Sequence, residues 1–326
     1  ILIVINSNYM NELTTDLKLL HEATLNNLKN SKANNTLRAY KSDFKDFAAF
    51  CAKHGLVSLP TEPKIVSLYI THLSKNSKIS TLRRRLVSIS MLHKLKGHYL
   101  DTKHPIIVEN LMGIRRVKGS IQKGKKPILI NHLKSIINVI NEQKLYEIKK
   151  LRDKSIILIG FGGGFRRTEL VSIDYENLEF VPEGLKITIK RSKTDQFGEG
   201  MTKGIPYFDN EIYCPVANLK KWLEISKIKS GPIFRRFSKG LSLTDKRLTD
   251  QSVVLLMKDY LKLAGIENKN FSGHSLRSGF ATVAADSRAD ERSIMAMTGH
   301  KTTQMVRRYI REANIFKNNA LNKIKI

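Results

Sequence analysis

Apolar residues near the start of the chain recur at helical spacing. Between positions 36 and 51 they alternate steps of three and four, which places them on one face of a helix. These residues are Leu37, Tyr40, Phe44, Phe47 and Cys51. Gly55 is a stop signal for this helix. Further helices are expected over Pro63–Leu73, after the capping residue Ser80, and over Ile106–Arg115. The pattern predicts a helical domain.

The second part of the chain combines helical spacing with one alternating stretch. Helices are expected over His132–Gln143, Ser155–Phe161, Val216–Ser226 and Val253–Leu263. Leu185–Lys190 alternates apolar and polar residues, as a strand with one buried face does. A turn over Ser192–Gln196 leads to a second strand near Thr202–Tyr207, which places Lys193 at the tip of a hairpin. The predicted fold class is mainly α with a small antiparallel β-sheet.

Residues 118–127 follow neither pattern. Glycines make this stretch flexible, and its lysines favour contact with phosphate. We interpret it as a linker, in agreement with a length of 326 residues, which is typical of about two domains. The predicted organisation is an arm over 1–30, a helical domain over 31–117, the linker over 118–127, a second domain over 128–316 and a tail over 317–326.

Composition indicates a class of partner only through its charge. Lys and Arg number 57 against 29 acidic residues, for a formal net charge of +28, and an excess of this size indicates a polyanion such as nucleic acid. An AT-rich genome would also raise the lysine content, although it would not explain clustered arginines. The two cysteines, Cys51 and Cys214, lie far apart and predict neither a disulfide framework nor a metal site. The apolar run Ile1–Ile5 is too short to span a bilayer, so no membrane association is expected.

Side chains suited to phosphate chemistry gather near the end of the sequence. His274 and Arg277 are three residues apart and share one face of a helix, where they could grip one phosphate. Gly299 and His300 form an expected turn, followed by a helix that carries Tyr309. Each motif alone is more often a surface pair or a packing residue, and only the combination indicates a reactive site.

A glycine-rich turn contributes a further arginine. Gly162–Gly164 precedes a helix with Glu169 in its first turn, and Arg166 lies at the start of that helix. A nucleotide-binding loop is not favoured, because neither G-x-x-x-x-G-K-[ST] nor G-x-G-x-x-G is present.

Taken in order, these residues resemble the tyrosine recombinase, or phage integrase, family. The resemblance covers about residues 32 to 315 and includes Cys214-Pro215-Val216 and Asn35-Thr36-Leu37. It implies an N-terminal helical core-binding (SAM-like) domain and an α+β catalytic domain. The catalytic residues that it implies are Arg166, Lys193, His274, Arg277, His300 and Tyr309.

The resemblance also implies a mechanism. Tyr309 would attack a phosphate and form a 3′-phosphotyrosine, with Arg166 and Arg277 holding the non-bridging oxygens. His274 is the preferred acceptor of the tyrosine proton, and Lys193 would protonate the leaving 5′-oxygen. Glu169 is interpreted as a support for Arg166. No cofactor, ATP or metal is implied.

The expected partner is double-stranded DNA, bound by a tetramer on two DNA sites, with accessory DNA-bending or directionality proteins as further partners. The expected location is the cytoplasm, in association with the nucleoid. The residues expected to contact DNA are Arg38, Lys41, Arg83, Arg84, Arg85, Lys123, Lys125 and Lys126. Three alternatives stay open: an enzyme like type IB topoisomerases, a telomere resolvase, and a catalytically silent DNA-binding protein.

Overall fold

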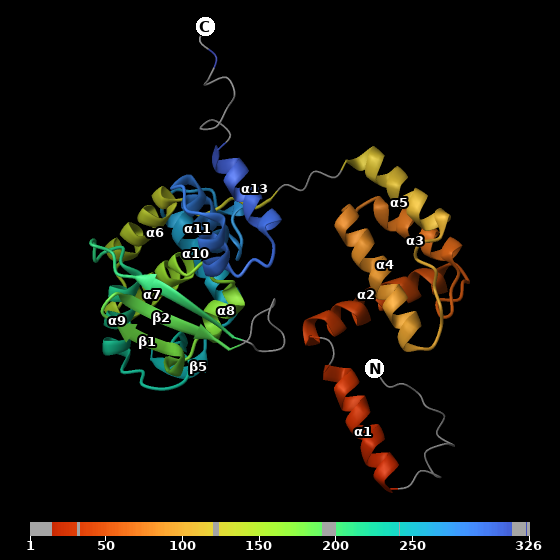
Figure 1. The fold of residues 1–326 in the computed structure, drawn as a ribbon, viewed down its shortest axis with the longest axis horizontal. Helices are drawn as coiled ribbons and strands as arrows, with labels where there is room; N and C mark the ends of the chain where they lie inside the picture. The colour runs from red at the N-terminus through yellow and green to blue at the C-terminus, as the bar shows by residue number, and fades with distance from the viewer. Residues whose placement is uncertain are drawn as a thin grey trace. The chain divides into compact units, whose positions relative to one another are not determined.

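The computed structural model describes residues 15–30, 33–119, 124–190, 200–240, 242–314 and 324. Contacts within the chain divide it into two compact units, 1–123 and 124–326 (Figure 1). None of the helices in the described ranges combines the length and the apolar character that crossing a bilayer requires.

The first unit is built from helices. Their bounds are α1 (Thr15–Asn30), α2 (Asn34–Lys53), α3 (Pro63–Ser74), α4 (Ile79–Leu95) and α5 (Pro105–Lys118). Phe47, Tyr69 and Ile89 belong to a buried core to which α2, α3 and α4 contribute. The predicted helical faces are confirmed, with one correction. Ser80 is not the cap of its helix, because α4 already begins at Ile79 after an extended Lys78.

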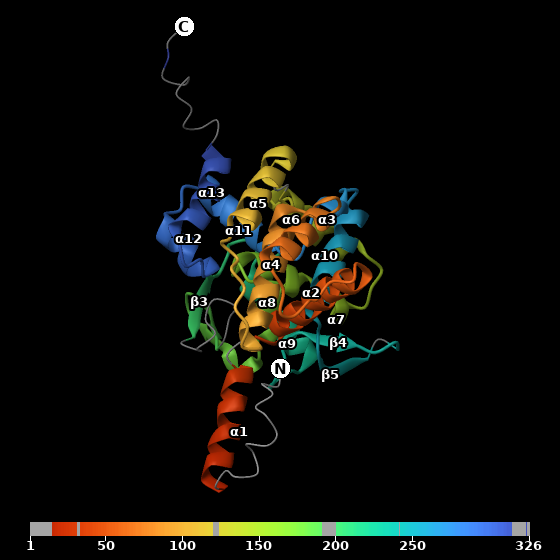
Figure 2. The same ribbon diagram turned by 90° about the vertical axis from the view of Figure 1, so that its right-hand side faces the viewer.

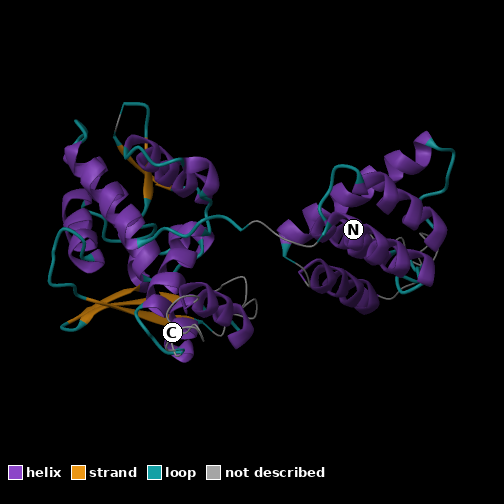
Figure 3. Cartoon of the chain, turned by 90° about the horizontal axis from the view of Figure 1, so that it is seen from above, coloured by secondary structure: helices purple, strands orange, loops and turns teal. Residues whose placement is uncertain are grey.

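The second unit combines helices with two small sheets. Its helices are α6 (Ile130–Glu142), α7 (Glu147–Gly162), α8 (Arg167–Ser172), α9 (Pro215–Ser226), α10 (Asp250–Leu263), α11 (Ser275–Asp286), α12 (Glu291–Thr298) and α13 (Thr303–Asn314). Helix α7 is buried on all sides from Ile156 to Ile159, because it packs against several other helices of this unit. Figure 3 shows helices through the interior of this unit and strands at its margin.

Both sheets are antiparallel. One has the order β1 (Leu178–Val181), β2 (Gly184–Ile189), β3 (Met201–Pro206), and the other pairs β4 (Arg235–Phe237) with β5 (Leu243–Arg247). In the predicted hairpin, Leu185 lies opposite Ile205. Strand β3 also contacts α12, and Figure 2 shows the two side by side. The mainly helical fold class with a small antiparallel sheet is confirmed, whereas β1 and the β4–β5 hairpin were not predicted.

The stretch predicted as a linker is shared between several parts of the chain. Lys118 ends α5, residues 120–123 lie outside the described residues, and the stretch from 124 onward belongs to the second unit. The backbone N–H of Lys126 donates to the Asn270 carbonyl at 2.7 Å. Gly279 allows Ile128 to approach α11 closely, since a Cβ on this glycine would lie 2.0 Å from the Ile128 oxygen. The predicted tail at 317–326 lies outside the described residues except for Ile324.

Candidate active site

The turn after α7 requires its glycines. A Cβ on Gly163 would lie 2.1 Å from the Phe165 ring, and Gly164 adopts a left-handed φ of 54°. This tight reversal lets Phe165 enter the core, where it is 2% exposed. The next residue, Arg166, then directly precedes the first turn of α8.

Glu169 orients Arg166. Its Oε2 accepts the backbone N–H of Arg166 at 2.9 Å, and its Oε1 forms an ion pair with the guanidinium group. The Glu169 side chain is 2% exposed, so its charge is held in a region that water does not reach. A buried carboxylate beside a partly buried arginine favours one orientation of the planar fork. The sequence interpretation of Glu169 as a support for Arg166 agrees with these contacts.

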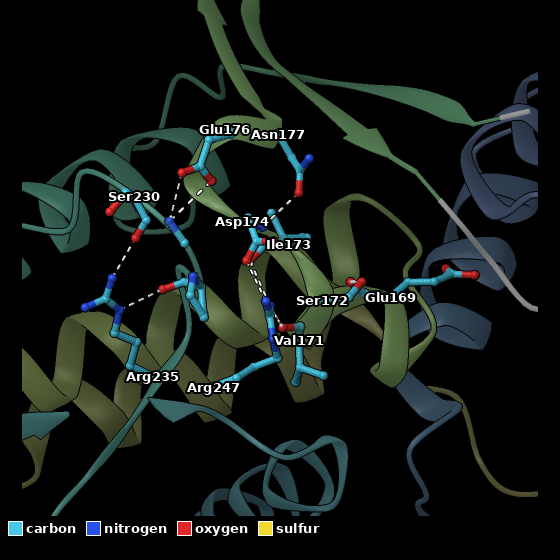
Figure 4. Close-up of polar contacts among 12 residues, drawn as sticks. Glu169, Val171, Ser172, Ile173, Asp174, Glu176, Asn177, Ser230, Arg235 and Arg247 are labelled. Atoms are coloured by element: carbon cyan, nitrogen blue, oxygen red, sulfur yellow. Dashed lines mark hydrogen bonds and ion pairs between the residues drawn. The ribbon is translucent and has the colours of Figure 1, made fainter. Parts of the chain in front are cut away.

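The other end of α8 is fixed by the second hairpin. Arg247 of β5 donates to the Val171 carbonyl at 2.6 Å and, through its other terminal nitrogen, to Asp174 Oδ1 at 2.6 Å. Glu176 accepts the backbone N–H of Gly231 at 3.0 Å. In Figure 4 these contacts surround the chain just after α8, and the Glu169 side chain points away from them. The network anchors the helix that carries Arg166 and Glu169.

Arg277 is a buried cation with unused hydrogen-bonding capacity. It is 1% exposed on α11, and its Nη1 donates to the Gly164 carbonyl at 3.0 Å. Its Nε and Nη2 find no hydrogen-bond partner in the part of the chain that the structure describes. Burial, followed by the charge of Arg166, lowers the pKa of Arg277 to about 10, so the group is still charged at neutral pH. Buried donors without a partner are energetically costly, and an anion would satisfy them.

The tautomer of His300 follows from Thr298. The Thr298 hydroxyl is buried and donates its single proton to the Ile294 carbonyl at 2.6 Å. Toward His300 Nδ1, at 2.7 Å, it can therefore only accept, so Nδ1 carries a proton. Burial, followed by the charges of Arg277 and Arg166, lowers the pKa of His300 to about 4. At neutral pH the ring is uncharged and its Nε2 is a proton acceptor.

Tyr309, on α13, lies beside His300. Its ring lies 6.1 Å from the His300 ring, centre to centre, at an interplanar angle of 31°. Val306, one turn earlier, is fully buried against α11 and α12 and fixes the helix. A cavity of about 280 Å³ is lined by Tyr309 and His274, among other residues.

Comparisons with known proteins show the family of this chain. Residues 128–314 match the Phage integrase family. An "Integrase/recombinase xerD homolog" of Selenomonas ruminantium is 41% identical over 99% of this chain and 98% of its own length. The chain belongs to the phage integrase family. A "Tyrosine recombinase XerC" of Leptospira interrogans is 26% identical over 88% of this chain and 86% of its own length.

Solved structures of recombinases share the fold of this family member. XerH recombinase in a post-cleavage complex with its palindromic difH substrate has a TM-score of 0.61 at 15% identity, over 81% of this chain and 71% of that one. A lambda integrase dimer bound to a COC′ core site has a TM-score of 0.57 at 16% identity, over 96% and 81% of the two chains.

The structure of this integrase family member brings most of the predicted catalytic residues together. The pKa of His300 responds to the charges of His274, Arg277 and Arg166, and the pKa of Arg277 responds to Tyr309. Lys193 lies outside the described residues. Sequence reasoning did not single out Thr298, which contacts His300, or Lys203 of β3, whose Nζ donates to the Gly163 carbonyl at 2.8 Å. The alternation of β3, which turns position 203 inward, was the available signal for the lysine.

The three consecutive arginines of α4 have different surroundings. Arg83 is exposed, whereas Arg85 is 18% exposed and pairs with Asp43 at 3.3 Å and Asp46 at 3.2 Å. Arg84 also pairs with Asp43 while remaining half-exposed. The run is thus partly structural.

The other residues predicted to contact DNA lie on both units. Arg38 and Lys41 are exposed on α2. Lys126 is exposed, Lys125 donates to the Lys269 carbonyl at 2.7 Å, and Lys123 lies outside the described residues.

A basic hollow in the first unit was not predicted from the sequence. Its volume is about 730 Å³, and it lies among the turn before α4, the first turns of α4 and the end of α5. Its cationic lining residues are Lys75, Lys78, Arg83, Arg115 and Lys118. We refer to this cavity, with these five lining residues, as the basic hollow.

Proposed function

We propose that Tyr309 is the nucleophile with which this tyrosine recombinase cleaves and rejoins DNA strands at specific sites. The observation that carries the proposal is Arg277, a fully buried cation with two donors that have no partner in the described ranges. The nearby Arg166 adds a second guanidinium, and Glu169 holds it in place. A phosphodiester satisfies such donors and balances their charge.

The reaction exchanges one phosphate ester for another. The Tyr309 oxygen forms a bond to phosphorus while the bond from phosphorus to the 5′-oxygen breaks, which leaves a 3′-phosphotyrosine and a free 5′-hydroxyl. Arg166 and Arg277 stabilise the negative charge that grows on the non-bridging oxygens. Lys193 supplies the proton to the 5′-oxygen. Attack by a 5′-hydroxyl reverses the step and rejoins a strand.

Two histidines compete as acceptors of the Tyr309 proton. His274 lines the cavity beside Tyr309 and is the acceptor that the sequence favoured. His300 is the second candidate, because its Nδ1 donates to Thr298 and its Nε2 is therefore free of a proton in the neutral ring. Single-turnover cleavage by His274→Asn and by His300→Asn, measured against pH, distinguishes them. The variant that loses the proton acceptor is rescued as pH approaches the pKa of tyrosine, about 10.

Double-stranded DNA is the proposed substrate. The structural neighbours include XerH with difH DNA and lambda integrase with a core site. On this chain the proposed backbone contacts are the basic hollow, which includes Arg83, together with Arg38, Lys41, Arg84, Lys125 and Lys126. Arg85 is not among them, because it pairs with Asp43 and Asp46. Assembly as a tetramer on two sites, with accessory DNA-bending or directionality proteins, is part of this proposal.

A nicked suicide duplex tests the nucleophile. The DNA beside the gene is incubated with the wild type and with Tyr309→Phe, without metal or ATP, and run on a denaturing gel. We expect a covalent protein–DNA band in the wild type alone, with DNA binding retained by Tyr309→Phe. A covalent band in Tyr309→Phe would refute the assignment.

Joining of two duplexes separates the proposed function from its alternatives. A recombinase produces strands that combine both input duplexes, whereas an enzyme like type IB topoisomerases reseals the one it cut. A telomere resolvase would instead produce hairpin ends.

A further inference from the structure

Lys203 occupies an inward-facing position of β3, where the alternation of the strand predicts an apolar residue. It is 1% exposed, and the alternate residue Ile205 faces the core in the same way. Its Nζ donates to the Gly163 carbonyl at 2.8 Å and lies 4.2 Å from the centre of the Phe165 ring. No carboxylate in the described part of the chain comes within the 4.0 Å of an ion pair with it. A buried lysine without an ion pair costs stability, so its presence needs a reason.

The contacts of Lys203 lead to the cleavage site. Gly163 and Phe165 belong to the turn that precedes Arg166, and the Gly164 carbonyl accepts the hydrogen bond of Arg277. Lys203 and Arg277 therefore hold adjacent carbonyls of one turn. This turn connects the two arginines. Arg166 follows it directly in the sequence, and Arg277 donates a hydrogen bond to its Gly164 carbonyl.

Among the described residues, the charges around Lys203 do not balance. Of the groups that face it, Glu169 on α8 is the anion, and Arg166, at the start of α8, and Arg277 on α11 are cations. His300, after α12, is also within electrostatic reach and is neutral at pH 7. Burial lowers the pKa of Lys203 to about 7, with Glu169 opposing the shift and the two arginines adding to it. Counted over the residues that the structure describes, this cluster has a surplus of positive charge that an anion would neutralise.

We propose that Lys203 is a positioning residue of the cleavage site: its ammonium group fixes the turn at Gly163 and adds a third positive charge behind Arg166 and Arg277. This inference rests on the proposed phosphate chemistry and deepens it. Since the side chain is buried and committed to Gly163 and Phe165, it acts through the turn and does not replace Lys193 at the leaving oxygen. A bound phosphate favours the charged form, so DNA binding at the site and proton uptake by Lys203 are coupled.

The test compares single-turnover cleavage of the suicide duplex by the wild type and Lys203→Met between pH 6.5 and 9.5. At pH 6.5 we expect the variant to be slower by about tenfold, the lower end of the loss seen when residues that orient metal ligands are replaced. At pH 9.5 the two rates should converge, because the wild-type lysine then also loses its charge. Lys203→Arg stays charged across this pH range. It should cleave at the wild-type rate at pH 6.5 and should not show the decrease that the wild type shows at high pH.

A lysine that also lies over aromatic rings, but at the surface, serves as the control. Lys220 lies over the Phe180 and Tyr207 rings at 5.2 and 5.1 Å but is exposed on α9. Lys220→Met should cleave like the wild type at every pH. A ratio between the wild type and Lys203→Met that stays constant across the pH range would reveal a merely structural lysine and overturn the proposal, as would equal rates throughout.

DNA affinity gives a readout that needs no cleavage. In the Tyr309→Phe background, affinity for the duplex should fall more steeply between pH 7 and 9 with Lys203 than with Lys203→Met. Equal pH dependence would contradict the proposal even if cleavage were never observed. Failure of the Tyr309 assignment is therefore distinguishable from failure of the Lys203 assignment.

Discussion

Single residues of the site owe their chemistry to burial. Arg277 is almost completely withdrawn from water but stays charged, and two of its donors lack partners among the described residues. Arg166 has the opposite situation, because Glu169 already occupies part of its guanidinium group. In a region of low dielectric such donors act strongly on a developing charge. In the proposed reaction, both arginines are therefore oriented before the phosphate binds.

Removing either arginine should therefore slow cleavage more than it weakens binding. We expect Arg277→Ala and Arg166→Ala to lower the single-turnover rate by about 10²-fold or more, as loss of one preorganised donor does in other enzymes. Arg277→Lys should recover little, because a lysine keeps the charge without the planar fork. Quench-flow cleavage alongside a binding assay measures both effects. Wild-type cleavage by Arg277→Ala would exclude it from the site.

His300 should make stability depend on pH. Its pKa of about 4 in the folded chain lies below the ordinary value of 6.5, so the unfolded chain binds a proton that the folded chain does not. The stabilisation is complete above pH 6.5 and is lost as pH falls toward 4. Thermal unfolding of His300→Gln should therefore vary less with pH across this window than that of the wild type. Parallel curves for the two proteins would contradict the burial of a neutral His300.

At the scale of elements, one aspartate joins two helices of the first unit. Asp43 on α2 is 2% exposed and accepts the Ser88 hydroxyl of α4 at 2.7 Å, in addition to its ion pairs with Arg84 and Arg85. The arginines on this side of α4 are thereby fixed to α2. This pairing leaves Arg83, on the exposed face of the same helix, available for a partner.

Breaking this junction should destabilise the bundle. Asp43→Asn leaves buried arginine nitrogens without their anion, and we expect a loss of about 3 kcal/mol in the free energy of unfolding. Asp46→Asn is the matched control, because Asp46 pairs with the same Arg85 but is 48% exposed. Its effect should stay below about 1 kcal/mol. Urea denaturation of both variants measures the difference, and equal effects would argue against a structural role for Asp43.

At the scale of the whole molecule, the net charge of +28 favours association with a polyanion. The basic hollow concentrates part of this charge in the first unit. In the second unit, Arg277 has two donors that lack a partner among the described residues, and these are the proposed phosphate contacts. A protein that neutralises phosphates with such groups releases counterions from DNA. Its affinity should therefore decrease as salt increases.

The salt dependence should distinguish the arginines of α4. We expect Arg83→Gln to weaken DNA binding and to reduce the slope of log affinity against log salt by about one. Arg85→Gln should lower stability but leave the slope unchanged, because Arg85 is occupied by Asp43 and Asp46. Binding isotherms at several salt concentrations provide the slopes. An unchanged slope for Arg83→Gln would remove it from the proposed interface.

The sequence by itself predicted most of the helices and the strands of the central hairpin, and it indicated the candidate catalytic residues. Helix α1, in the stretch expected to be an arm, and helix α12 were not predicted. Helical spacing around Phe47 and the glycines before Arg166 act over a few residues, and their consequences can be read locally. The order from Arg166 to Tyr309 then indicated the family. The strands β1, β4 and β5 were not predicted from the sequence, because short strands owe their stability to partners elsewhere in the chain.

Only the tertiary structure decided which charged side chains have partners within the chain. The sequence does not show that Arg85 meets Asp43, or that Lys203 lies against Gly163, because each pair is separated by about forty residues. Nor does it show that Thr298 fixes the tautomer of His300, since this depends on where the hydroxyl proton goes. Burial and the choice of partner set the charge, the pKa and the reach of a side chain, and both arise only when distant segments pack together.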